Sequence, residues 1–226
     1  MAEALNGDLT VRVVVDANSL PWTASPSGSV HRRRLHAVGA AESGQVTSIV
    51  RYEPESKFPP HDHPDGEEIL VLEGVFSDEH GDWPAGTYLL NPEGFRHAPF
   101  SRQGCLLFVK LRQFPGRDRK HVAIDTRTLL WARASGRELK RLYSQQGYAD
   151  LTYLERWRAG ASPGERVYPL GAELLVLAGS FEDEHGRYGA HTWLRLPPES
   201  RLLPKTAAGC ELYVKEGGLR YLRAAR

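Results

Sequence analysis

The stretch His61-Asp-His63-Pro-Asp-Gly-Glu67 and, about thirty residues later, the stretch Pro92-Glu-Gly-Phe-Arg-His97 decide both the fold and the site of this chain. Together they supply three imidazoles and one carboxylate, a ligand set that zinc, iron, manganese and nickel accept. Because His61 and His63 are two residues apart, both side chains point to the same face of a β-strand. The spacing therefore predicts two ligands that share one face.

The other two ligand positions need a turn and a second strand. Glu67 can reach the face of the histidines after the turn at residues 64–66, and the apolar run Ile69 to Leu72 behind it is typical of a buried strand. His97 must come from a separate strand, because Pro92 and Gly94 favour a turn before it. We therefore predict one divalent metal inside a small β-barrel, bound by His61, His63, Glu67 and His97.

The chain repeats itself at a constant offset. Glu68-Ile-Leu-Val-Leu-Glu-Gly74 matches Glu173-Leu-Leu-Val-Leu-Ala-Gly179, and Gly104-Cys105 matches Gly209-Cys210, in each case 105 residues further along. A long repeat of this kind indicates a duplicated structural unit. The segment from Phe114 to Lys120 has the composition of a linker. We therefore expect one domain over residues 1–116 and a second over residues 117–226.

The second copy lacks the ligand set. At the offset of 105, the positions of His61, His63, Glu67 and His97 are taken, in that order, by Arg166, Tyr168, Ala172 and Leu202. We therefore expect one metal per chain, in the N-terminal barrel. One hypothesis is that Arg166 and Tyr168 fill the second barrel, with the guanidinium holding an anion or a neighbouring carboxylate.

Charge and composition argue against several classes of function. A net charge of +1 with acids and bases evenly mixed offers no face for a polyanion, so no nucleic-acid partner is expected. The basic run Arg32-Arg33-Arg34 is short and fits a solvated strand edge. No apolar stretch reaches membrane-spanning length, and the first residues lack the pattern of a signal peptide. The expectation is a cytoplasmic protein without a membrane partner.

Both halves consist of short apolar segments separated by Gly, Pro, Asn and Asp, which is typical of all-β sandwiches and barrels. The two motifs resemble the paired motifs of the cupin superfamily, H-x-H-x3-E-x6-G ending at Gly74 and P-x-G-x2-H ending at His97. The surrounding residues, including Asp78-Glu-His-Gly81, are most similar to the cupin domain of ChrR-type anti-sigma factors. The resemblance implies two jelly-roll barrels, a bicupin, and carries the metal ligands onto the four positions given above.

The resemblance implies two functions of different classes. In ChrR-type relatives the metal, usually zinc, belongs to a regulatory or stress-response module, whose partner would be a regulatory protein or a small-molecule ligand. Other cupins are non-haem metal dioxygenases that act on small carbonyl or phenolic compounds, because four protein ligands leave two positions of a six-coordinate ion open. The regulatory function and zinc are favoured at this stage, since a copy without ligands is useful chiefly as a scaffold or interface.

Three points stay open or depart from the resemblance. The helical domain with which ChrR-type proteins bind a sigma factor has no counterpart before the first repeat, which begins near Leu9, so direct sigma-factor binding is not expected. Catalytic residues cannot be assigned from the sequence. A homodimer is one option among the oligomeric states.

Further residues near the motifs are candidates for supporting roles. Glu68 competes with Glu67 as the carboxylate ligand, but its counterpart Glu173 in the copy without ligands favours a structural role. Candidates for hydrogen bonds to the ligands are Asp62, Tyr88 and Arg96. Candidates for the pocket lining are Trp83 and Phe95.

Overall fold

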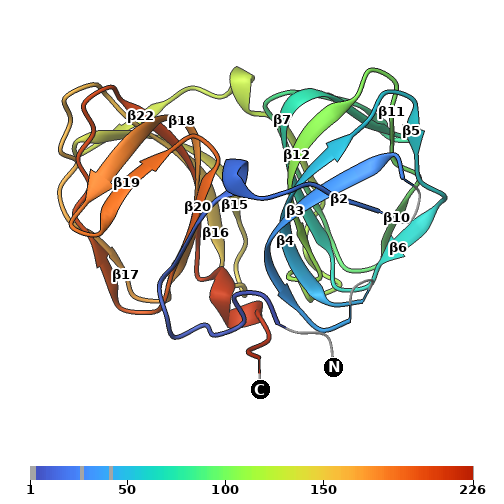
Figure 1. Cartoon of the computed structure of the whole chain (residues 1–226), viewed down its shortest axis with the longest axis horizontal. Coiled ribbons are helices and arrows are strands. Elements are labelled where there is room, and N and C mark those ends of the chain that lie inside the picture. The colour runs from blue at the N-terminus through green and yellow to red at the C-terminus, as the bar shows by residue number, and fades with distance from the viewer. Residues whose placement is uncertain (1–3, 26–27, 41–42, 226) are drawn as a thin grey trace. The chain divides into compact units, whose positions relative to one another are not determined.

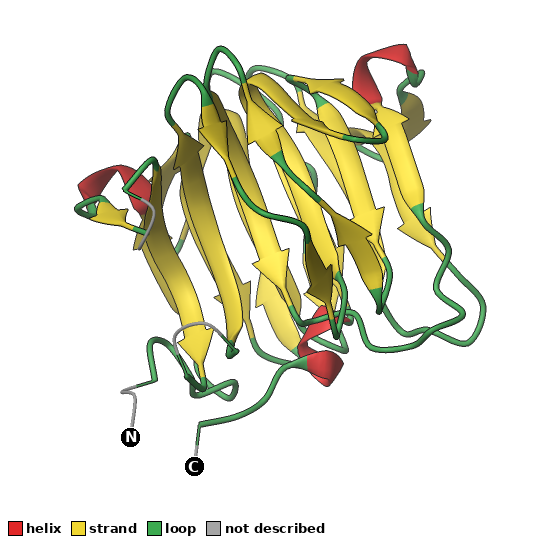
Figure 2. Ribbon diagram, turned by 90° about the vertical axis from the view of Figure 1, so that its right-hand side faces the viewer, coloured by secondary structure: helices red, strands yellow, loops and turns green. Residues whose placement is uncertain are grey.

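The computed structural model describes residues 4–25, 28–40 and 43–225. The chain forms two compact units, of which the first contains Leu20–Thr128 and the second contains Asp8–Ser19 and Leu129–Leu222. Both units consist of strands, and helical structure in the described residues is limited to the short 3-10 turns η1 (Ala17–Ser19), η2 (Thr126–Thr128) and η3 (Gly218–Tyr221) (Figure 2). The all-β class expected from the sequence is confirmed.

In the first unit, ten strands form one large antiparallel sheet that curves into a barrel (Figure 1). Its main path runs β13-β9-β7-β12-β4-β3-β2. These strands are β2 (Thr23–Ala24), β3 (Val30–Val38), β4 (Gln45–Tyr52), β7 (Glu67–Asp78), β9 (Thr87–Asn91), β12 (Cys105–Leu111) and β13 (Val122–Asp125). The short strands β5 (Ser56–Lys57), β8 (Gly81–Pro84) and β11 (Phe100–Ser101) attach beside this path, and β6 (His61–His63) pairs with β10 (Phe95–His97) as a separate ribbon.

The second unit repeats this plan with eight strands in its large sheet, in the order β1-β20-β18-β22-β16-β15-β14 with β19 beside β18. These strands are β1 (Val13–Asp16), β14 (Ala132–Ala134), β15 (Arg137–Ser144), β16 (Leu151–Trp157), β18 (Ala172–Asp183), β19 (Gly186–Gly189), β20 (Thr192–Leu196) and β22 (Cys210–Glu216). A separate ribbon is formed by β17 (Arg166–Tyr168) and β21 (Ser200–Leu202). The second ribbon lies 105 residues after the first.

Each unit takes one edge strand from the other half of the sequence. Strand β1 pairs with β20 of the second unit, with Asp16 opposite Thr192. Strand β13 pairs with β9 of the first unit, with Asp125 opposite Thr87. Because an edge strand leaves a row of backbone groups unpaired, each borrowed strand completes hydrogen bonding along an exposed sheet edge. The boundary expected between residues 116 and 117 would place β1 in the first domain and β13 in the second. In the structure, β1 instead pairs within the second compact unit and β13 within the first.

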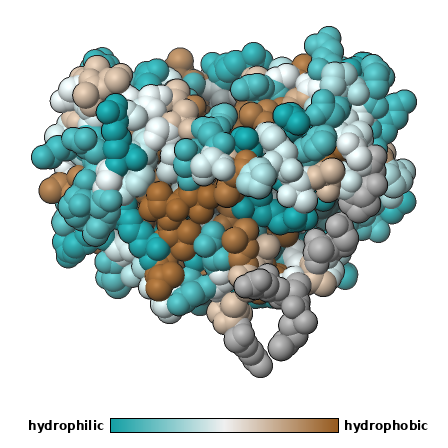
Figure 3. Space-filling view, in the orientation of Figure 1, coloured by the Kyte–Doolittle hydropathy of each residue, from teal (hydrophilic) through white to brown (hydrophobic). Residues whose placement is uncertain are grey.

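Apolar residues on alternating positions build a separate core in each unit. In the first, Ile69, Val71, Phe76 and Leu107 are each about 1 % exposed or less and pack in one cluster. The second has a larger cluster that includes Trp157 and Phe181. The face seen in Figure 3 is mostly hydrophilic, with apolar side chains gathered in one area. No helical segment in the described part of the chain has the length and apolar character needed to cross a membrane.

Sterics explain why the last position of the first motif is a glycine. Gly74 has φ of 71°, and a Cβ built there would lie 2.2 Å from the carbonyl oxygen of Gly104. Gly179 repeats both features in the second unit, with a φ of 71° and a carbonyl oxygen of Gly209 at 2.0 Å. Both glycines therefore serve a close approach of two strands that no larger residue permits.

We expect Gly74→Ala to lower the free energy of unfolding by about 3 kcal/mol or more, because the methyl group adds overpacking to the cost of a left-handed backbone. Gly94→Ala is the matched control, since Gly94 also has a positive φ, of 83°, but a Cβ there meets nothing within 4 Å. Its cost should be near 1 kcal/mol. Urea unfolding of both variants checks this, and equal losses would contradict the steric explanation.

Candidate metal centre

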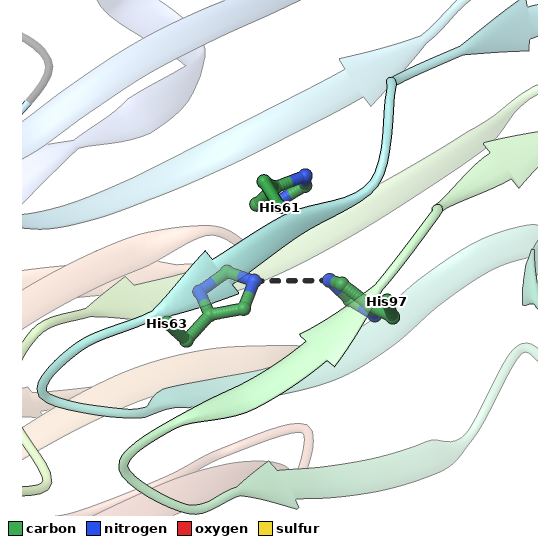
Figure 4. Close-up of side chains that lie close together, drawn as sticks. All are labelled: His61, His63 and His97. Carbon is green, nitrogen blue, oxygen red and sulfur yellow. Dashed lines mark hydrogen bonds between the residues drawn. The ribbon is translucent and has the colours of Figure 1, made fainter.

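Three histidines converge inside the first unit. His61 and His63 lie on β6 with Asp62 exposed between them, as strand alternation predicts. His97 ends β10, and the antiparallel register of β6 and β10 places it directly opposite His61. One nitrogen from each ring lies within 4.8 Å of the others. Figure 4 shows His63 and His97 facing each other, with Nε2 of one 3.0 Å from Nε2 of the other and His61 beside them.

Glu67, the first residue of β7, adds a carboxylate to this cluster. Its Oε2 lies 3.5 Å from Nε2 of His63 and 3.6 Å from Nε2 of His97. Atoms that bind one ion at about 2.1 Å lie roughly 3 to 3.5 Å apart, so these three donors have the spacing of ligands to one ion. Two neutral imidazoles with lone pairs directed at each other also need a proton or a cation between them. The residues present therefore fit a divalent metal.

Two side chains and one backbone carbonyl that the sequence analysis missed orient the ligands. Asp78 Oδ2 lies 3.1 Å from Nδ1 of His97, so this ring carries its proton on Nδ1 and keeps Nε2 free to bind. Asn91 Nδ2 donates to Glu67 Oε2 at 3.0 Å. The backbone carbonyl of Pro59 lies 2.9 Å from Nδ1 of His61 and has the same effect there. Asp78 belongs to a turn that recurs in both copies, and the repetition concealed its role in the first.

Burial and neighbouring charges shift the pKa values of the two buried histidines, His63 and His97, in opposite directions. Burial lowers the pKa of His63, and the charge of Glu67 opposes this only in part. Burial also acts to lower the pKa of His97, but the hydrogen bond to Asp78 and the charges of Glu67 and Asp78 outweigh it, so that pKa is raised. His63 is therefore the ring held neutral, and His97 is the ring that holds a proton more tightly.

The cluster opens onto two adjoining cavities. An inner cavity of about 90 Å³ is lined by His61, His63 and Glu67 together with Tyr52 and apolar side chains. An outer cavity of about 320 Å³ also reaches His61 and His63 and is lined by several arginines. Burial and the charge of Glu67 raise the pKa of Tyr52 well above its ordinary value, so its phenol stays protonated. No local pattern in the sequence indicated that Tyr52 lines this space.

The other candidates from the sequence have different places. Asp62 and Arg96 pair with each other at 3.2 Å and are exposed, so neither contacts a ligand. Tyr88 donates to Glu68 at 2.5 Å, away from the histidines, which agrees with a structural role for Glu68. Trp83 donates to Asp78 at 3.2 Å and supports the site indirectly. Phe95 stacks on His121 at 5.0 Å and lines neither cavity.

The second unit confirms the predicted replacement of the ligands. Strands β17 and β21 pair with Arg166 opposite Leu202, the same register that places His61 opposite His97. Tyr168, Ala172 and Leu202 are almost fully buried. Among the residues described, the one histidine cluster suited to a metal is that of His61, His63 and His97.

In the second unit, a buried ion pair occupies the part of the interior that corresponds to the histidine cluster of the first. Nη2 of Arg166 lies 3.3 Å from Oε2 of Glu155, whose other oxygen accepts a hydrogen bond from Trp157 at 2.7 Å. Glu155 faces Leu212 as Val50 faces Leu107 in the first unit, so the carboxylate stands where the first copy has valine. The guanidinium therefore holds a neighbouring carboxylate, one of the two options predicted from the sequence.

A jelly-roll barrel whose interior carries metal-binding histidines and a glutamate defines the cupin class. The sequence model of the ChrR cupin-like domain matches the chain twice, over residues 10–115 and 119–220. The chain therefore belongs to the ChrR cupin-like family and carries two copies of its domain. Comparison with curated proteins gives no match.

Solved structures share the fold at low sequence identity. A proposed dioxygenase from Nostoc punctiforme is 18 % identical with a TM-score of 0.76, covering 93 % of this chain and 82 % of that one. A proposed glyoxylate-induced protein from Pseudomonas aeruginosa is 12 % identical with a TM-score of 0.71, covering 96 % and 92 %. The pirin YhhW from Escherichia coli, in complex with nickel(II), is 14 % identical with a TM-score of 0.67, covering 95 % and 100 %. These likenesses confirm the bicupin fold.

We expect Asp78→Asn to weaken metal affinity about 10- to 100-fold, because the carboxylate that fixes the proton of His97 is lost. The matched control is Asp183→Asn, since Asp183 occupies the same position in the second unit and bonds Arg12 and Tyr188 instead. Titration with Zn²⁺ against a competing chelator gives both affinities. Equal affinity in the Asp78 variant and the wild type would contradict this role.

Metal affinity should also fall as the pH is lowered, because protonated imidazoles cannot bind a metal. The raised pKa of His97 means that proton competition begins above the ordinary histidine value of about 6.5. The lowered pKa of His63 means that this ring competes only at more acidic pH. Chelator competition at several pH values measures the profile. A flat profile from pH 8 to pH 5 would contradict histidine ligation.

Proposed function

We propose that the first unit is a metal-dependent centre that acts on a small carbonyl or phenolic compound, as cupin dioxygenases do. The observation that carries the proposal is that His61, His63 and Glu67 line cavities rather than a sealed core. A structural zinc is enclosed by four protein ligands, whereas a catalytic metal keeps at least one position for a substrate or water. An accessible ligand set favours the second kind of site.

Different residues would bind the metal and the substrate. His61, His63, Glu67 and His97 would hold the ion, and Asp78 fixes the proton of His97 at Nδ1. When bound, the metal would supply a Lewis acid that polarises a carbonyl or phenolic oxygen. The apolar walls of the cavities would bind the carbon skeleton and exclude water. Tyr52 supplies a protonated hydroxyl in the inner cavity.

A regulatory, zinc-containing module is the second candidate, and the family match to the ChrR cupin-like domain favours it. The second unit supports it as well, because a barrel without a metal offers scaffold or interface. The two candidates differ in the native metal and in turnover. Iron in protein purified without chelators would favour the dioxygenase, and zinc would favour the regulatory module.

Both candidates require the metal to be in the first unit, which matched substitutions can test. His63→Ala and His97→Ala should reduce metal content from one per chain to near zero, because an incomplete ligand set loses most of its affinity. Tyr168→Phe, at the position equivalent to His63, should leave one metal per folded chain. Elemental analysis gives the content. Two metals per chain, or one retained in both histidine variants, would exclude the predicted ligand set.

Turnover separates the candidates. Iron-loaded protein should consume oxygen in the presence of a β-diketone or a hydroxyaryl ketone, and His63→Ala should not. We would abandon the dioxygenase in favour of the regulatory module if the native metal were zinc and no member of such a panel caused oxygen uptake with any of iron, manganese or nickel.

A further inference from the structure

The inner cavity beside the histidine cluster is much smaller than the outer one. Its volume of about 90 Å³ is well below the roughly 300 Å³ or more of pockets that hold organic ligands, but it has room for a molecule of a few atoms. The two cavities share His61, His63 and Arg32 in their linings. Arg32 lies where they meet and Arg34 lines the outer one, so the expectation of a solvated strand edge is wrong for both arginines.

Among the described residues, the walls of the inner cavity that the outer cavity does not share are mostly apolar. They include four side chains that are each 1 % exposed or less, Val30, Ile69, Phe76 and Leu107. Apart from Arg32 and the hydroxyl of Tyr52, the polar side chains around this space are the metal ligands themselves. Cavities with apolar walls stay dry and take up apolar molecules such as xenon.

The second unit fills the corresponding space with charged side chains. Its Glu155 stands at the position of Val50. Two arginines hold this carboxylate, with Nη2 of Arg166 at 3.3 Å and Nη1 of Arg137 at 3.7 Å. Arg137 corresponds to Val30 by the pairing register of β15 with β16 and of β3 with β4. Positions that carry small apolar residues in the first unit therefore carry long charged residues in the second.

An unfilled space of this kind lowers the stability of the first unit, because a core is destabilised in proportion to the volume left without contacts. The second unit has the same fold and fills the space, so the barrel does not require it. The space is found in the copy that has the metal ligands and is filled in the copy that has lost them. This correlation indicates a role at the metal centre.

An open groove of about 460 Å³ adjoins the inner cavity. Phe58 and Pro99 line both spaces, so these two side chains form the partition between them. The ring of Phe58 also packs near Tyr52 and His61, with ring centroids 5.7 and 6.2 Å away. Small motions of such side chains are enough to admit a diatomic molecule, whereas an organic substrate needs the wider outer cavity.

We propose that the inner cavity is the binding site for dioxygen beside the metal, and that the outer cavity takes the organic molecule. The inference deepens the dioxygenase function proposed above and rests on it. Dioxygen fits a space of about 90 Å³, and as an apolar molecule it gains free energy on leaving water for apolar walls. In this position it would face His63 and Glu67, two of the metal ligands.

Xenon tests the cavity without relying on the metal. Wild-type crystals under xenon pressure should show one xenon atom between Ile69, Phe76 and Leu107, because apolar cavities bind this gas. Val30→Phe should abolish the xenon site, since the added ring occupies the space. Ordered water in the wild-type cavity in place of xenon would overturn the proposal.

A matched pair of substitutions distinguishes an unfilled space from a packed core. Val30→Ile adds one methylene group beside the cavity and should leave the melting temperature unchanged or raise it. Among the described residues, Val71 belongs to the same core cluster but not to the cavity lining. Val71→Ile should therefore lower the melting temperature by about 2 °C or more through overpacking. Equal losses in the two variants would contradict an unfilled space at Val30.

Nitric oxide, a diatomic molecule that binds iron(II), tests the position of the cavity relative to the metal. In iron-loaded protein, Val30→Phe should weaken nitric oxide binding at least about tenfold, because the ring overlaps the bound molecule. The same variant should keep its affinity for pentane-2,4-dione, which the outer cavity takes. Val71→Ile is the control and should keep both affinities. Electron paramagnetic resonance follows nitric oxide binding, and calorimetry follows the diketone.

The outcomes separate this proposal from the function on which it rests. With iron bound, unchanged nitric oxide affinity in Val30→Phe would overturn the inner site and leave the metal-dependent function standing. Native zinc without oxygen uptake would overturn the dioxygenase function, and dioxygen as the occupant with it, whatever xenon shows. Thermal melting verifies that each variant is folded, and Ile69→Phe, on the same wall, replaces Val30→Phe if that variant is not.

Discussion

The contact on which the first unit depends is the approach of two imidazole nitrogens, Nε2 of His63 and Nε2 of His97, to 3.0 Å in a buried interior. Such an arrangement is stable only with a proton or a cation between the rings. Asp78 and Glu67 bring negative charge to the same place, and both raise the pKa of His97. The interior of the barrel therefore combines two carboxylates with three imidazoles, a donor set that a bound cation would satisfy.

The second unit fills the corresponding interior with charged side chains of its own. Arg166 takes the place of His61, and Glu155 supplies a carboxylate at a position that is valine in the first copy. A buried pair of this kind contributes little net stability, but removing one partner leaves an uncompensated charge. Burial raises the pKa of Glu155, although Trp157 and Arg137 act against this. The two copies therefore share one barrel fold but differ in its interior, which holds a histidine cluster in the first unit and an ion pair in the second.

The two copies together also distinguish the residues that serve the fold from those that serve the site. Gly74 and Gly179 share a φ and a close contact, so both belong to the fold. Arg112 and Gly217 share a backbone conformation but not a side chain. The fold uses a left-handed backbone at this position, and in the first unit the residue that adopts it, Arg112, lines the outer cavity. Single-copy proteins offer no such internal comparison.

The sequence by itself determined the all-β class, the duplication and the four candidate ligands, because each depends on local spacing: a separation of two positions between histidines on one strand, and an offset of 105 between copies. Only the tertiary structure decided what lies between distant segments. The pairing of Asp78 with His97, the cavity shared by Arg32 and Arg112, and the exchange of β1 and β13 all join residues far apart in the chain. Strand alternation shows which residues share a face, but which strands become neighbours depends on how the barrel closes, and no local pattern encodes that.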